Sequence, residues 1–143
     1  MIYVMSDLHG CFDKYLKMIE KIDLRPEKRK KVLTYLWHSG IFVEIEVNGK
    51  NYFLSHTVPE KEVMIKSEKC DLESFILGEP DYELTYFDDK VIVTGHTPTG
   101  LIDKAYTGRI YIKNNHIAVD CGAVFENGRL GCICLDYMEE FYI

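Results

Sequence analysis

The sequence has little positive charge and no long hydrophobic run. Its 17 lysine and arginine residues are outnumbered by 23 acidic residues, which leaves a formal net charge of −6 at pH 7. The single basic run, at 28–31, is typical of the solvated face of a helix, so nucleic-acid binding is disfavoured. No stretch approaches the ~20 apolar residues of a membrane span, and the N-terminus enters a strand-like segment directly. These features predict a cytoplasmic protein without a membrane segment.

Paired cysteines are also missing. The chain has an odd number of cysteines and no CxxC pair; they are Cys11, Cys70, Cys121, Cys132 and Cys134. This pattern favours reduced, partly buried thiols over disulfides or a zinc site.

The length and composition predict one domain, spanning 1–143. With 143 residues and 47% hydrophobic content, the chain can bury one core but is small for two. It contains no repeat, no low-complexity segment and no linker.

Apolar periodicity predicts a mixed α/β (α+β) fold in which strands and helices alternate. The clearest local signal is the pair of alternating strands around Asn48-Gly49, a dipeptide that suits a type I′ hairpin turn. The other expected strands lie at 2–5, 91–94, 109–113, 117–121, 130–135 and 140–143. Helices are expected at 11–22, from Pro26 to Trp37, and around Leu72–Leu77.

Three of the predicted strands end in residues that can hold a metal ion. The first is followed by Asp7 and His9, and two later apolar strands are followed by His56 and His96. In an extended chain, positions i and i+2 share one face, so Asp-x-His would present two ligands together. A carboxylate with imidazoles suits Zn, Mn or Fe better than Ca or Mg. These four residues are therefore the predicted metal ligands.

Each of these signals is weak when it is taken alone. A single histidine in a turn is more often a hydrogen-bonded surface residue than a ligand. The shared placement at strand ends is what favours a site. His38 follows a predicted helix, and His116 lies in the NNH turn, so both are interpreted as structural.

Three segments carry a specific combination of motifs: SDLHG at 6–10, TGHTPTG at 94–100 and IAVDCGAVFENGRLGCICLD at 117–136. Together they resemble the calcineurin-like metallophosphoesterases, specifically the bacterial serine/threonine protein phosphatase branch, which includes symmetrical diadenosine-tetraphosphate hydrolases. The resemblance covers residues 1 to about 24 and about 30 to 143. It implies a β-sandwich flanked by helices, with a two-metal centre where strands of both sheets end.

The resemblance also implies roles for individual residues. Asp7 and His9 match ligands of the first metal, and His56 and His96 match ligands of the second. Supporting roles around this centre are implied for Gly95, Thr97, Asp120 and Gly122.

The sequence departs from the family pattern in its centre. The GDxxDRG and GNHE motifs are absent, so the chain reads as a truncated form with an internal deletion. With them go the aspartate that bridges the two metals, an asparagine ligand, the histidine thought to protonate the leaving group and a phosphate-binding arginine. No arginine occurs between Arg29 and Arg109, so a second phosphate-contacting arginine is missing as well. Ser55 and Thr57 also differ from the residues usual beside this histidine.

Two functions are open at this stage. The first is a metal-dependent phosphoester hydrolase that uses metal-bound water on a phosphate ester, with weak or no activity and no identified catalytic acid. It would use Mn, Zn or Fe, one ion or two, and act on a phosphoprotein, a nucleotide or a small phosphoester. The alternative is a catalytically inactive binding or scaffolding module. Because lost strands would leave sheet edges open, a homodimer that covers those edges is a further expectation.

Overall fold

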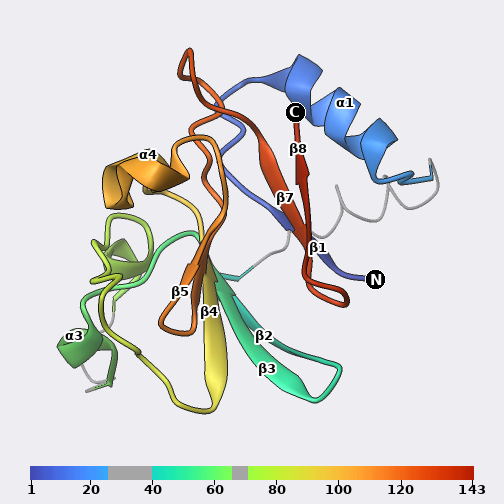
Figure 1. Ribbon diagram of the computed structural model, residues 1–143. Helices are drawn as coiled ribbons and strands as arrows, with labels where there is room; N and C mark the ends of the chain where they lie inside the picture. The colour runs from blue at the N-terminus through green and yellow to red at the C-terminus, as the bar shows by residue number, and fades with distance from the viewer. Residues whose placement is uncertain (26–39, 66–70) are drawn as a thin grey trace.

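The computed structural model describes residues 1–25, 40–65 and 71–143, which form two β-sheets with helices against them (Figure 1). The predicted α+β class is confirmed. The predicted helix from Pro26 to Trp37, together with His38 and Cys70, lies outside the described residues.

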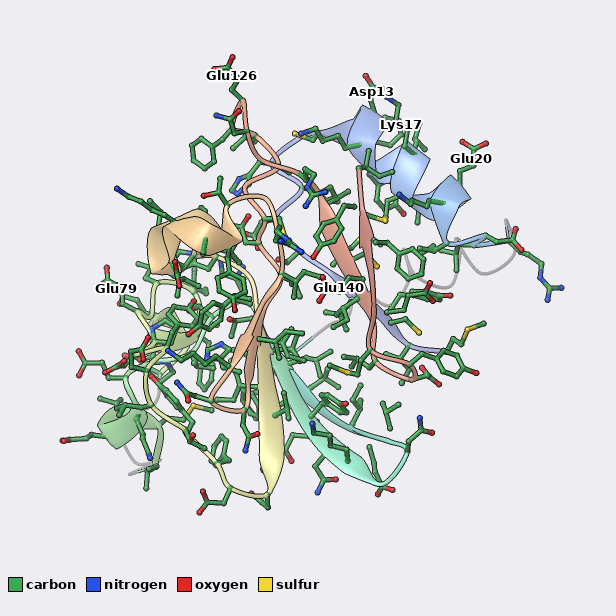
Figure 2. All side chains as sticks on the ribbon, viewed as in Figure 1. Asp13, Lys17, Glu20, Glu79, Glu126 and Glu140 are labelled. Atoms are coloured by element: carbon green, nitrogen blue, oxygen red, sulfur yellow. The ribbon has the colours of Figure 1, made fainter. Side chains whose placement is uncertain are left out.

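The smaller sheet contains β1 (Tyr3–Met5), β7 (Gly131–Cys134) and β8 (Glu139–Tyr142), in the order β1-β7-β8 with antiparallel pairing. Helix α1 (Phe12–Lys21) packs against it, because Met18 and Ile22 lie in one apolar cluster with Leu130 and Cys132. Figure 2 shows the charged side chains of Asp13, Lys17 and Glu20 pointing away from the molecule on the opposite face of this helix. The helix is therefore amphipathic, as its sequence predicts.

The larger sheet has five strands in the order β2-β3-β4-β6-β5. They are β2 (Phe42–Val47), β3 (Lys50–Ser55), β4 (Lys90–Thr94), β5 (Tyr111–Lys113) and β6 (His116–Ala118). The three central strands, β3, β4 and β6, run parallel, whereas β2 and β5 are antiparallel strands at the edges. The carboxyl ends of the three central strands consequently meet at one end of the sheet.

The two sheets face each other across the main core. Val93 and Ile117 of the larger sheet pack in one cluster with Ile133 of β7 and Val4 of β1. Because side chains alternate along a strand, Ile92 points to the opposite face of the same sheet. There it packs with residues of α3 (Lys61–Ile65) and of the short 3-10 helix Glu73–Phe75. The arrangement is a sandwich with helices on its outer faces, as expected.

The Asn48-Gly49 hairpin is confirmed. Asn48 has φ 53° and Gly49 has φ 76°, the left-handed pair that a type I′ turn requires. A second two-residue turn joins β5 to β6, where Asn114 and Asn115 have φ 53° and 56°. This turn corrects the placement of His116, which is not in a turn but is the first residue of β6 and is buried.

Several boundaries differ from the predictions. The strands expected at 109–113 and 117–121 are shorter, because the Asn114-Asn115 turn sets their pairing and β6 ends at Ala118. Helix α3, helix α4 (Thr99–Ile102) and the 3-10 helix Lys104–Tyr106 were not anticipated. They are too short to show a helical apolar period, so sequence periodicity could not reveal them.

Four of the five cysteines lie among the described residues. Cys11, Cys121, Cys132 and Cys134 are free thiols, and the last three are buried. Among the described residues, none of the helices has the length and apolar character needed to cross a membrane.

Candidate metal centre

Because the central strands run parallel, residues that are distant in the sequence meet at the end of the larger sheet where the carboxyl ends of these strands lie. His56 directly follows β3, Gly95 and His96 follow β4, and Asp120 lies two residues after β6. Hydrogen bonds continue between these segments beyond the strands, from Gly95 N to His56 O at 2.9 Å and from Val119 N to Thr94 O at 2.8 Å. The carboxyl ends of β3, β4 and β6 therefore lie side by side at one end of the sheet.

Asp7, in the loop after β1 of the smaller sheet, contacts residues at this end of the larger sheet. Its Oδ2 accepts a 2.8 Å hydrogen bond from the backbone amide of His96. Its Oδ1 lies 3.7 Å from His56 Nδ1 and 3.8 Å from His9 Nε2. The side chain of Asp7 is 4% exposed, so this carboxylate is largely removed from water. The rings of His9 and His56 thus lie beside the Asp7 carboxylate, whereas His96 contacts it through its backbone amide.

The two later histidines contact each other directly. His56 Nε2 and His96 Nδ1 are 3.0 Å apart, and the rings meet edge to face with their centroids 4.8 Å apart. In a hydrogen bond of this kind, one ring nitrogen carries the hydrogen and donates, and the other accepts, according to the tautomers of the two rings. Both rings reach solvent, so the site is open on this side.

Asp120 adds a carboxylate that was expected only to support the centre. Ligand atoms of Asp7, His9 and Asp120 lie within 4.8 Å of one another. Oδ1 of Asp120 accepts a 2.9 Å hydrogen bond from Gly122 N, whereas Oδ2 is buried without a partner in the part of the chain that the structure describes. Burial raises the pKa of the Asp120 carboxyl, and the neighbouring Asp7 charge raises it further. The signal in the sequence was its position after a strand, the same signal that identified the histidines.

The backbone at the site is unusual. Asp7, His9 and His96 have φ of 53°, 42° and 67°, values that non-glycine residues rarely adopt. Each such residue costs about 1–3 kcal/mol and persists where the surroundings fix it, most often at functional sites. The finding also corrects the reason given for the Asp-x-His spacing. β1 ends at Met5, so Asp7 and His9 are brought together by a left-handed turn and not by a shared strand face.

Gly95 is required by the close approach of the two loops. A Cβ atom at Gly95 would lie 1.9 Å from Asp7 Oδ2 and 2.2 Å from Ser6 Oγ. The next turn is closed by a 2.8 Å hydrogen bond from Thr97 N to Gly95 O. The glycine thus permits the contact between Asp7 and His96.

A buried polar layer lies behind the centre. Thr94 Oγ1 and His116 Nε2 are 2.8 Å apart, and the Tyr82 ring lies 4.7 Å from the His116 ring. Burial lowers the pKa of His116 to about 4, so this histidine is neutral near pH 7. Burial raises the pKa of Tyr82, whose hydroxyl is buried without a hydrogen-bond partner among the described residues. These contacts agree with a structural role for His116.

Cationic side chains are scarce at the centre. Within the described ranges, no lysine or arginine side chain forms an ion pair with Asp7 or Asp120. Lys14 donates a 2.5 Å hydrogen bond to the carbonyl oxygen of Ala123, one residue after Gly122. Among the described residues, the side chains within ion-pair distance of the Asp7 carboxylate are therefore those of His9 and His56.

The chain has little similarity to known proteins. No protein-family model matches the chain, and no curated protein matches it. A solved structure described as a novel archaeal phosphodiesterase is similar at a TM-score of 0.33 and 16% identity, over 72% of this chain and 50% of that chain. The chain spans about half the length of that structure, and a likeness at this level carries no argument about function.

Proposed function

We propose that the chain is a metal-dependent phosphoester hydrolase of the serine/threonine-phosphatase type, acting in the cytoplasm on a phosphoprotein, a nucleotide or a small phosphoester. The observation that carries the proposal is the meeting of Asp7, His9, His56 and His96 at the ends of strands from both sheets. The motif resemblance of the same segments points to the same chemistry.

The residues present fit a divalent transition metal. One buried carboxylate and imidazole nitrogens form a donor set that Mn, Zn or Fe accepts. Burying a carboxylate is costly unless a positive charge or hydrogen bonds compensate it, and a cation beside Asp7 would supply that charge. The buried, unpartnered Oδ2 of Asp120 adds a second acceptor that a cation would satisfy.

Such an ion, when bound, acts as a Lewis acid and lowers the pKa of a coordinated water. The chain itself contributes the orientation of the ligands. Asp7 is held by the amide of His96, and the glycine at 95 lets the two loops approach closely enough for this bond. The exposed faces of His9 and His56 leave the centre accessible to a phosphate ester.

The same structure limits the expected rate. Guanidinium groups that clamp a phosphate and an acid that protonates the leaving group each contribute orders of magnitude in rate. The motifs that supply these groups in the family that the sequence resembles are absent, and no described arginine forms an ion pair with the carboxylates of the centre. Weak turnover is therefore expected.

A binding module without catalysis is the second candidate. It is favoured by the 3.0 Å contact between His56 and His96, which engages ring nitrogens that a metal would otherwise use. In this case the centre would hold its shape through hydrogen bonds among its own residues.

The test is hydrolysis of p-nitrophenyl phosphate by metal-stripped protein supplied with Mn²⁺. The His96→Ala variant removes one predicted ligand, and Glu126→Ala, at an exposed loop tip, is the control (Figure 2). Turnover that requires both Mn²⁺ and His96, with the control unchanged, supports the hydrolase. Equal rates in the wild type and in His96→Ala would exclude this centre as the source of activity and leave the binding module.

A further inference from the structure

We infer that Asp120 is a ligand of the metal ion, so that Asp7, His9 and Asp120 together hold a single divalent transition-metal cation. This inference rests on the proposed function and adds a ligand to its centre. It concerns the residue that was expected to play only a supporting role.

The first support is distance. Ligand atoms of Asp7, His9 and Asp120 all lie within 4.8 Å of one another, which is a spacing that one ion between them can bridge with small adjustments of the side chains. Two of these residues come from the loop after β1, and the third follows β6 of the other sheet. The cluster thus joins both sheets.

The second support is the unused oxygen of Asp120. The residue is 2% exposed, and its Oδ2 has no hydrogen-bond partner among the described residues. A buried carboxylate oxygen without a partner is costly, and the great majority of such atoms in proteins are satisfied. Because Oδ1 is already bonded to Gly122 N, a cation on the Oδ2 side would complete the carboxylate.

The third support is the rigid placement of Asp120. Its carbonyl oxygen accepts a 2.8 Å hydrogen bond from Thr99 N, and the preceding residue, Val119, donates a 2.8 Å bond to Thr94 O. Gly122, with φ 72°, turns the chain so that its amide meets the carboxylate. A side chain held on both sides in this way needs little reordering to bind an ion.

The competing explanation is a protonated Asp120 that merely packs beside Asp7. The Asp120→Asn variant separates the two, because asparagine has the shape of the neutral acid and keeps an oxygen for the Gly122 amide. If Asp120 is a ligand, removing its charge weakens metal binding. If it is a neutral packing residue, asparagine replaces it without effect.

The experiment is a calorimetric titration of the metal-stripped full chain with Mn²⁺, in the wild type and in Asp120→Asn. We expect at least a tenfold weaker Mn²⁺ affinity in the variant, since even partners that only orient a ligand are worth tenfold or more. Circular dichroism should be unchanged. Asp71→Asn, an exposed carboxylate that bonds only Ser74 in the described structure, is the matched control and should bind as the wild type does.

The outcomes are distinguishable. Equal Mn²⁺ affinity in the wild type and Asp120→Asn would overturn the ligand assignment and leave the proposed function standing. A wild type that binds neither Mn²⁺ nor Zn²⁺ would overturn both. If Asp120→Asn does not fold, the test is the NMR chemical shift of the Asp120 carboxyl carbon in the wild type. Direct ligation should change this chemical shift when one equivalent of Zn²⁺ is added. An unchanged chemical shift would contradict the inference.

Discussion

The backbone amide of His96 donates a 2.8 Å hydrogen bond to Oδ2 of Asp7. This bond joins the loop that follows β1 of the smaller sheet to the loop that follows β4 of the larger sheet. Because the amide makes this bond, the His96 ring does not bond Asp7, and its Nδ1 contacts His56 Nε2 instead. The contact positions the candidate centre between the two sheets.

Replacing Gly95 with alanine should disrupt this contact. A Cβ atom would lie 1.9 Å from Asp7 Oδ2, so either the carboxylate or the loop must move. We expect a loss of about 1–3 kcal/mol in the free energy of unfolding, as for other overpacked sites, together with weaker metal binding. Denaturant unfolding and Mn²⁺ titration measure the two effects. Gly40→Ala is the control, because its Cβ would lie 3.6 Å from the nearest described atom, and equal behaviour of both variants would contradict the prediction.

Divalent transition metals should stabilise the fold. A ligand that binds only the native state raises its stability by about 2.7 kcal/mol when present at about 100 times its Kd. Mn²⁺ or Zn²⁺ should therefore raise the Tm of metal-stripped protein, and a chelator should reverse the rise. Mg²⁺ should act more weakly, because imidazole ligands suit transition metals better. An identical rise in His9→Ala would show that the metal binds elsewhere.

His116 should make the fold sensitive to acid. Burial lowers its pKa from 6.5 to about 4, so the folded state resists protonation while the unfolded state accepts it. The stabilising effect is complete above the unfolded pKa and is lost as the pH falls from about 6.5 to about 4, by up to about 3 kcal/mol. The side chains that contact the His116 ring, those of Thr94, Tyr82 and Tyr86, are uncharged in this range.

The measurement is the free energy of unfolding as a function of pH in the wild type and in His116→Gln. Glutamine can still bond Thr94 but does not titrate. The variant should lose less stability on acidification than the wild type. Parallel pH curves for the two proteins would contradict the prediction.

The buried thiols should be inert in the folded protein. Burial raises the pKa of Cys121 and of Cys132 to about 12, so little reactive thiolate forms at mildly alkaline pH. Iodoacetamide followed by peptide mapping should label these two residues only after denaturation. Cys11 is half-buried and is the internal control, because its thiol should react with iodoacetamide before those of Cys121 and Cys132. Equal labelling of Cys121 and Cys11 in the native protein would be the contrary result.

Self-association is the last prediction. Among the described strands, β2 and β5 form the edges of the larger sheet, and Phe42 on β2 is 48% exposed. Light scattering on the 16.7 kDa chain should give twice the monomer mass if two copies pair through such an edge. Phe42→Lys, which places a charge on the edge strand, should lower the measured mass. A monomer mass for the wild type would contradict the predicted homodimer.

Much of the local structure could be predicted from the sequence. Asn48-Gly49 encodes its turn because few residue pairs adopt two left-handed conformations in succession. The apolar segments before His56 and His96 indicate strands because short apolar runs bounded by glycine, proline and small polar residues favour buried sheet. These signals lie within a few residues of one another, so no knowledge of the distant chain is needed.

The short helices and the strand ends could not be predicted in the same way. Helix α4 forms where Thr99 bonds the carbonyl of Asp120, a partner 21 positions further along the chain. The polar NNH segment predicts a turn at His116, whereas pairing with β4 places this residue in a buried strand. In both cases contacts between distant segments outweigh local propensity.

Local patterns in the sequence predict which residues could act as ligands and that each of them follows a strand. Asp7, His9, His56 and His96 are all in this group. Those patterns do not predict that β3, β4 and β6 run parallel, which is the order that brings Asp120 to Asp7 and His9. The physical reason is that strand-forming patterns are local, whereas the order of strands in a sheet depends on pairings between distant segments. The order of the strands in the larger sheet thus sets which residues meet at the candidate centre.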